Sequence, residues 1–121
     1  MTDEQFEIVK EKQIPVEVCP SSNKATMQLA VLSQIKSIPY LYRCGAKIAP
    51  CCDDTMLFNT NMINETFELV NLLKLNESQL KQVMLDAADA IFDTSCLQKL
   101  KDEIEKVQIT TEEAKTEEIK E

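Results

Sequence analysis

Two short runs of strand-forming residues place the strongest constraint on the fold. Residues 14–19 alternate in polarity and stop at Pro20, and residues 46–51 form an apolar run that ends before Asp53. Short runs of this kind, bounded by turn-forming residues, are typical of strands. The 26 residues between the runs leave room for a crossover that contains a helix. The sequence therefore predicts a parallel βαβ unit.

The predicted crossover contains one clearly marked helix. Pro39 in a first-turn position and Gly45 as a terminator frame a short helix over residues 40–44. Residues 21–23, which follow the first predicted strand, have the composition of a loop. Residues 24–36 are apolar enough for a helix but lack clear start and stop signals, so their structure stays open.

Helix caps and apolar stripes mark four further helices. Thr2 and Gln5 form a capping-box pattern, which predicts a helix through residue 12, and Asn76 and Thr94 are predicted caps of the last two helices. The stripes of the three C-terminal helices are Ile63, Phe67 and Val70, widened by Leu72 and Leu73; Leu80, Val83, Met84, Ala87 and Ile91; and Leu97, Leu100, Ile104 and Val107. Such stripes normally face the core, and a partner-binding groove is the alternative.

The composition favours a mostly helical chain. The sequence has 121 residues, of which 44% are hydrophobic, and it contains a single glycine, Gly45. Few glycines mean few positions that accept a positive φ angle in tight turns. A two-stranded parallel sheet is a poor structure on its own, because both of its faces need cover. We therefore expect an α/β piece of a larger fold.

Charge and cysteine content limit the kinds of partner and compartment. A net charge of −8 disfavours binding to nucleic acid or to anionic membrane surfaces, since both require a basic face. No apolar stretch is long enough to cross a bilayer. The five cysteines are irregularly spaced, and no Cys-x-x-Cys pair occurs among them. We expect reduced thiols and a cytoplasmic protein.

The adjacent carboxylates Asp53 and Asp54 are the main candidate site. Holding two like charges side by side is costly unless a metal or ligand neutralises them, which makes the end of this strand a candidate active-site rim. A plain solvated turn is the alternative for such a pair. A second alternative is a thiol-based metal or redox site built from Cys44, Cys51 and Cys52.

Several motifs carry a resemblance to a known family. Residues 14–23 resemble the EVCPxSN strand of adenosine deaminases and adenosine deaminase-like enzymes. Residues 40–48 resemble the helix-Gly-strand run that leads into the S/TDDP motif of that family, which reads Cys-Asp-Asp-Thr at residues 52–55. Residues 56–61 are similar to the xxFxTN continuation. The likeness covers about residues 1–104.

The resemblance implies a fold, a reaction and roles for two residues. The fold would be the C-terminal portion of a (β/α)₈ TIM-type barrel over residues 1–107, with the last two strands, followed by an acidic, disordered tail over 108–121. Asp53 would be a zinc ligand and a catalytic partner of the attacking water, and Asp54 would bind the purine. The reaction would be hydrolytic deamination at C6 of a purine nucleoside or nucleotide.

This sequence departs from the family pattern in ways that affect activity. It has no histidine, whereas the resemblance implies a His-x-His pair and two further histidines, all of which would lie before Met1. Thr55 stands where the family has proline, and Cys51 and Cys52 stand where it has Asn and Ser or Thr. We therefore expect this chain to be inactive by itself, and a non-catalytic, α-rich interaction module is the alternative function.

Overall fold

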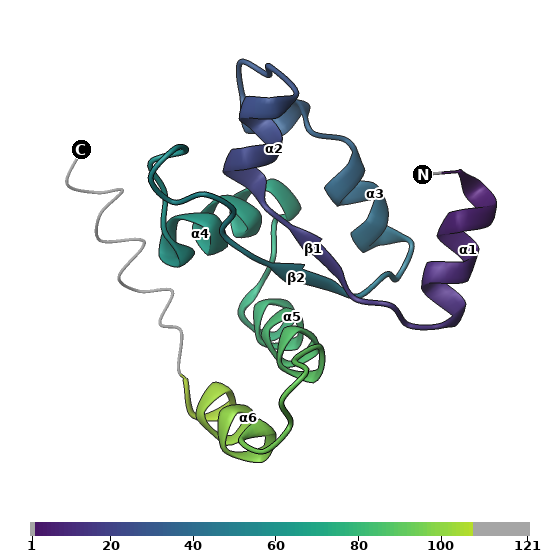
Figure 1. Ribbon diagram of the computed structural model, residues 1–121, viewed down its shortest axis with the longest axis vertical. Helices are drawn as coiled ribbons and strands as arrows, with labels where there is room; N and C mark the ends of the chain where they lie inside the picture. Colours follow the sequence, from purple (N-terminus) through teal and green to yellow (C-terminus); the bar gives the residue numbers. More distant parts are fainter. Residues whose placement is uncertain (1, 108–121) are drawn as a thin grey trace.

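The computed structural model describes residues 2–107 (Figure 1). The predicted acidic tail at 108–121 lies outside the described residues. Strands β1 (Val16–Val18) and β2 (Ile48–Pro50) pair in parallel, with Val16 opposite Ile48 and Val18 opposite Pro50. The predicted parallel βαβ unit is thus confirmed, and each strand is shorter than predicted. No helix within the described residues is long and apolar enough to cross a membrane.

The crossover differs from the prediction near its start. Residues 21–23 belong to helix α2 (Pro20–Thr26) and do not form the predicted loop, because Pro20 occupies the first helical turn, where its fixed φ favours a helix. The ambiguous stretch after it holds a short 3₁₀ helix, η1 (Leu32–Gln34). Helix α3 (Ser37–Arg43) then begins three residues earlier than predicted. Gly45 ends it at φ +85°, as predicted.

The remaining helices surround the two strands. They are α1 (Asp3–Glu11), α4 (Met62–Leu73), α5 (Glu77–Asp89) and α6 (Leu97–Lys106). In Figure 1, α1 and α3 lie on one side of the strand pair and α5 lies on the other, with α4 beside α2. The ring of Phe6 in α1 contacts the ring of Tyr40 in α3 at 5.4 Å between centroids. Helices α4 and α5 contact β2, whose three residues are all buried, whereas Glu17 in β1 remains exposed.

Two of the three predicted caps hold and one is wrong. The capping box of Thr2 and Gln5 opens α1, and the Asn76 side chain accepts a hydrogen bond from the backbone of Gln79 at the start of α5. Thr94 does not cap the last helix, because α6 begins only at Leu97 and its N-cap, Cys96, makes no side-chain hydrogen bond.

The buried face of α4 matches the prediction only in part. Leu72 and Leu73 pack against the core as predicted, but Ile63 and Phe67 do not. Ile63 and Phe67 are 83% and 62% exposed, whereas Leu69 is fully buried and Glu65 is 1% exposed. A carboxylate on the buried face breaks the apolar periodicity, so the exposed stripe looked like the core-facing one. The core cluster joins α4 to both strands and to the crossover; it consists of Phe6, Val18, Ile35, Ile38, Leu41, Ala46, Ile48, Leu69 and Val83.

Candidate active site

The carboxyl ends of β1 and β2 bring the two sequence motifs together. The backbone N–H of Cys51 donates to the carbonyl of Val18 at 2.9 Å, so the two strands remain side by side up to their ends. The hydroxyl of Ser22, in the first turn of α2, donates to Oδ2 of Asp53 at 2.9 Å. These two residues are 31 positions apart in the sequence. Residues that follow neighbouring parallel strands meet at one edge of the sheet, which is where barrel enzymes place their catalytic groups.

Asp53 is exposed, but the group that orients it is buried. Ser22 is only 7% exposed, and its hydroxyl holds one oxygen of the Asp53 carboxylate. No further hydrogen bond to this carboxylate is found within residues 2–107. Oδ1 of Asp53 is therefore available to a ligand at the mouth of the strand pair. Sequence reasoning had singled out Asp53 but had not found Ser22, because no local pattern links the two positions.

Asp54 has a different partner from its neighbour. Its Oδ1 accepts a hydrogen bond from the backbone N–H of Leu57 at 2.7 Å, which stabilises the turn that follows β2. The alternative to an active-site role for the two aspartates was a plain solvated turn. Asp54 fits that alternative, because its side chain stabilises its own turn, but Asp53 does not, because its side chain is held by α2. Because one carboxylate is held by α2 and the other by its own loop, the two side chains can serve different ligands.

A buried carboxylate behind the strand ends was not predicted. Glu65 in α4 accepts from the Ser21 backbone N–H through Oε2 at 3.0 Å and from the Thr60 hydroxyl through Oε1 at 2.5 Å. The side-chain amide of Asn64 also donates to the Thr60 hydroxyl, at 2.9 Å. Glu65 lies four positions before Leu69 on the same helical face, and only the structure shows that this face is buried.

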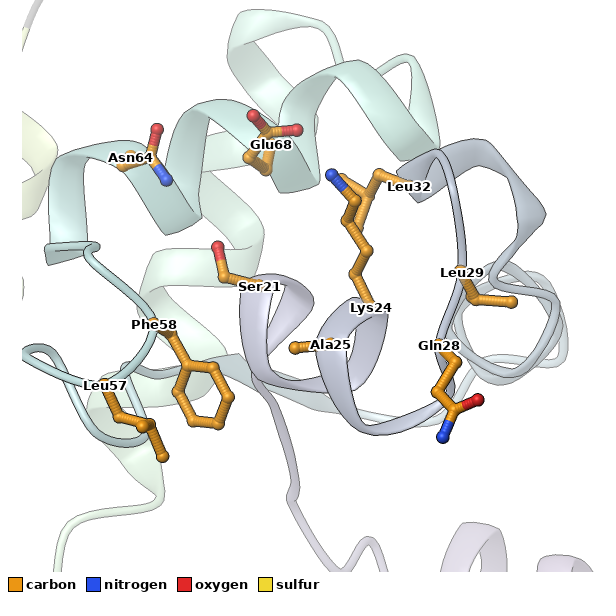
Figure 2. Close-up of a pocket in the computed structure, with 10 residues that line it drawn as sticks. All are labelled: Ser21, Lys24, Ala25, Gln28, Leu29, Leu32, Leu57, Phe58, Asn64 and Glu68. Carbon is orange, nitrogen blue, oxygen red and sulfur yellow. The ribbon is translucent and has the colours of Figure 1, made fainter.

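A cavity of about 660 Å³ lies beside these residues, between α2 and α4 (Figure 2). Ser21 and Lys24 line it from α2, Asn64 and Glu68 line it from α4, and Phe58 closes one side. Asp53 and Asp54 do not line this cavity. The charged side chains of Lys24 and Glu68 line the cavity, whereas the carboxylate pair singled out by the sequence follows the end of β2.

The thiol-based site has little support from the structure. Cys44 ends α3 before β2, whereas Cys51 and Cys52 follow β2, so they lie at opposite ends of that strand. Burial raises the pKa of the Cys51 thiol, with a smaller contribution from the negative charge of Glu17. A raised pKa keeps the thiol protonated, and metal binding and redox attack both need the thiolate.

The cysteines should differ in reactivity in a pH-dependent way. Burial raises the pKa of the Cys19 thiol to about 11, and the charges of Cys51 and Asp53 add to this effect. At about pH 8 we expect iodoacetamide to modify the exposed Cys96 at least about tenfold faster than Cys19, because only the thiolate reacts. The rate at Cys19 should then rise as the pH approaches 11. Peptide mass spectrometry would measure both rates.

Labelling in urea provides the control, because unfolding should make the modification rates of Cys19 and Cys96 similar. Equal rates at about pH 8 in the folded protein would contradict the buried environment of Cys19.

Asp53 fits one position in a zinc coordination shell. Catalytic zinc sites use about three protein ligands and keep one open position. The sequence contains no histidine, and within the described residues no group of three or more Cys, Asp or Glu side chains lies close enough to hold a metal ion. A zinc ion at Asp53 would therefore need its other protein donors from outside residues 2–107.

Comparison with known proteins identifies the family. The family model described as adenosine deaminase matches residues 2–107. This chain belongs to the adenosine deaminase family. The adenosine deaminase of Plasmodium vivax is 34% identical over 95 residues, which cover 71% of this chain and 26% of that protein. The chain spans about a quarter of the length of the curated relatives it matches.

Solved structures of this family share the fold. The crystal structure of Arabidopsis N6-mAMP deaminase MAPDA matches with a TM-score of 0.77 and 29% identity, covering 88% of this chain and 32% of that one. Arabidopsis ADAL complexed with IMP matches with a TM-score of 0.76 and 28% identity, covering 87% of this chain and 31% of that one. The two strands and their helices thus correspond to part of the TIM-type barrel of adenosine deaminases, which confirms the predicted fold class.

Proposed function

We propose that this chain supplies the carboxylate part of the active site of a zinc-dependent purine deaminase. The reaction is hydrolytic loss of the C6 amino group from a 6-aminopurine nucleoside or nucleotide. The observation that carries the proposal is the hydrogen bond from Ser22 to Asp53, because it joins the ends of two neighbouring parallel strands at an exposed carboxylate. Membership in the adenosine deaminase family supports the choice of reaction.

Asp53 is the proposed metal ligand and a catalytic residue. A bound zinc ion would lower the pKa of its water to near 7 and so supply hydroxide at neutral pH. Ser22 holds Oδ2 of Asp53, and Oδ1 accepts no hydrogen bond within residues 2–107, so Oδ1 is the proposed zinc-binding atom. Oδ2 has a second lone pair beside the one that Ser22 uses, and this lone pair would accept the proton from water.

Asp54 is the proposed contact to the purine base. Its Oδ1 is engaged with the Leu57 N–H, so Oδ2 is the atom proposed to contact the substrate. An ionised carboxylate accepts from a ring N–H, and a protonated one donates to a ring nitrogen. Either arrangement fixes the orientation of the heterocycle relative to Asp53, and such positioning lowers the barrier of the chemical step.

The names of the relatives support a choice of substrate class. The relatives are named for adenosine and for N6-mAMP, and ADAL was solved with IMP, which is the product expected when AMP loses its 6-amino group. The shared part of these molecules is a purine with a substituent at C6. We therefore propose a 6-aminopurine nucleoside or nucleotide as substrate. Five free cysteines suit the reducing conditions of the cytoplasm, which is the proposed location.

The chain by itself is proposed to be inactive, because Asp53 provides one zinc ligand where about three are needed. A chimera tests this proposal directly. Residues 2–107 would replace the matching segment of the Plasmodium vivax adenosine deaminase, which supplies the rest of the barrel. We expect the chimera to bind zinc stoichiometrically and to release ammonia from adenosine or AMP, whereas the 121-residue chain alone should do neither.

Metal analysis and an ammonia assay would measure both outcomes, and circular dichroism would verify folding. A folded chimera that binds no zinc and deaminates neither purine would rule out the proposed function.

A further inference from the structure

Glu65 is buried to an extent that is unusual for a charged residue. It is 1% exposed, and with Ser22 it makes up the buried polar and charged residues within 2–107. Removing a carboxylate from water is costly unless hydrogen bonds replace those of the solvent. Glu65 meets this condition with two donors, the Ser21 backbone N–H and the Thr60 hydroxyl. These donors lie in two different segments of the chain, so the carboxylate joins parts of the fold that are distant in sequence.

One of these segments is the start of α2. The N-cap of α2 is Cys19, which makes no side-chain hydrogen bond, so the first turn of the helix lacks a local cap. The first N–H groups of a helix have no partner within the helix. Glu65 provides the missing acceptor from α4, which is 44 residues away in the sequence. Hydrogen bonds to an ionised acceptor are stronger than those between neutral groups.

The same turn of α2 carries the group that holds Asp53. Ser21 is adjacent to Ser22, and the Ser22 hydroxyl donates to Asp53 Oδ2 at 2.9 Å. A shift of the backbone at Ser21 would therefore move the hydroxyl away from the carboxylate. Groups that orient a metal ligand affect activity even though they do not touch the metal themselves.

We propose that Glu65 is a positioning residue for the deamination reaction, because it fixes the backbone at Ser21 and thereby the Ser22 hydroxyl and the Asp53 carboxylate. The importance of this placement for catalysis rests on the proposed function, in which Asp53 binds zinc. The placement itself does not depend on that function and can be measured in the 121-residue chain.

Two substitutions separate the geometry of Glu65 from its charge. Glu65→Asp keeps the charge but shortens the side chain by one methylene, so it cannot reach both donors. Glu65→Gln loses the charge but keeps the length; its oxygen can accept from the Ser21 N–H while its NH₂ group donates to the Thr60 oxygen. Glu68→Gln, on the same helix and without a hydrogen bond in the described part of the chain, is the matched control.

Amide hydrogen exchange, followed by NMR in the 121-residue chain, gives the first readout. In Glu65→Asp we expect the Ser21 amide to exchange about tenfold faster than in the wild type, and in Glu65→Gln less than about threefold faster. The amide of Cys51, which donates to Val18 in the sheet ladder, should change little in either variant. An unchanged Ser21 rate in Glu65→Asp, or an equal increase at Cys51, would overturn the proposal.

Kinetics in the chimera give the second readout. Glu65→Asp should lower kcat about tenfold with less than about a twofold change in KM, and Glu65→Gln should recover most of the loss. Loss of kcat in Glu68→Gln to the same degree would show a general effect of α4 and overturn the positioning role. If the wild-type chimera has no activity, the proposed function fails, and the exchange rates still decide whether Glu65 places Ser21.

Discussion

Replacing Asp53 with alanine in the chimera is expected to abolish zinc binding and to lower kcat/KM at least about a thousandfold. Loss of a metal that contributes about 4 kcal/mol of transition-state stabilisation corresponds to a rate change of this size. Metal analysis of the purified variant and an ammonia assay with adenosine would measure both effects. The variant should remain folded, because Asp53 is exposed and lies outside the hydrophobic core.

The adjacent residue supplies the matched comparison for this prediction. Asp54→Asn should keep its zinc and lose activity through weaker binding and orientation of the purine, because Asp54 is held by the loop at Leu57 and not by α2. If Asp53→Ala retained stoichiometric zinc, or if Asp54→Asn lost its zinc as well, the division of roles between the two carboxylates would be wrong.

The second large effect concerns the core of the 121-residue chain. Leu69 in α4 is fully buried, so Leu69→Ala should lower the free energy of unfolding by about 3 kcal/mol. That loss is a large part of the total stability expected for a domain, which is about 5–15 kcal/mol. Urea denaturation followed by circular dichroism would measure the change.

Phe67→Ala on the same helix is the control for Leu69→Ala. Phe67 is 62% exposed, and its removal should cost less than about 1 kcal/mol, although phenylalanine is the larger side chain. The comparison tests which face of α4 is buried in solution. A greater loss of stability in Phe67→Ala than in Leu69→Ala would show that the periodicity of the sequence, and not the structure, identifies the buried face.

The sequence predicted the ends of helices well where capping or terminating residues mark them. The capping pairs at Thr2 and Asn76 and the terminator Gly45 lie where helices begin and end in the structure. Each of these signals acts through hydrogen bonds or backbone angles within a few residues, so neighbouring sequence is sufficient to reveal it. Pro20 shows the limit of such reasoning. Proline can end a strand and can also begin a helix, so the strand end was predicted but the helix that starts at Pro20 was not.

The amino-acid sequence was sufficient to predict that two short strands pair in parallel across a helical crossover and that a carboxylate pair follows the second strand. The folded arrangement was needed to reveal that Ser22 holds Asp53, that Glu65 holds Ser21, and that α4 buries Leu69 and exposes Phe67. The cause of this difference is distance along the chain. Periodicity gives the spacing of side chains within a helix, but the rotation of that helix and the partners of its polar groups depend on segments that are 31 to 44 residues away.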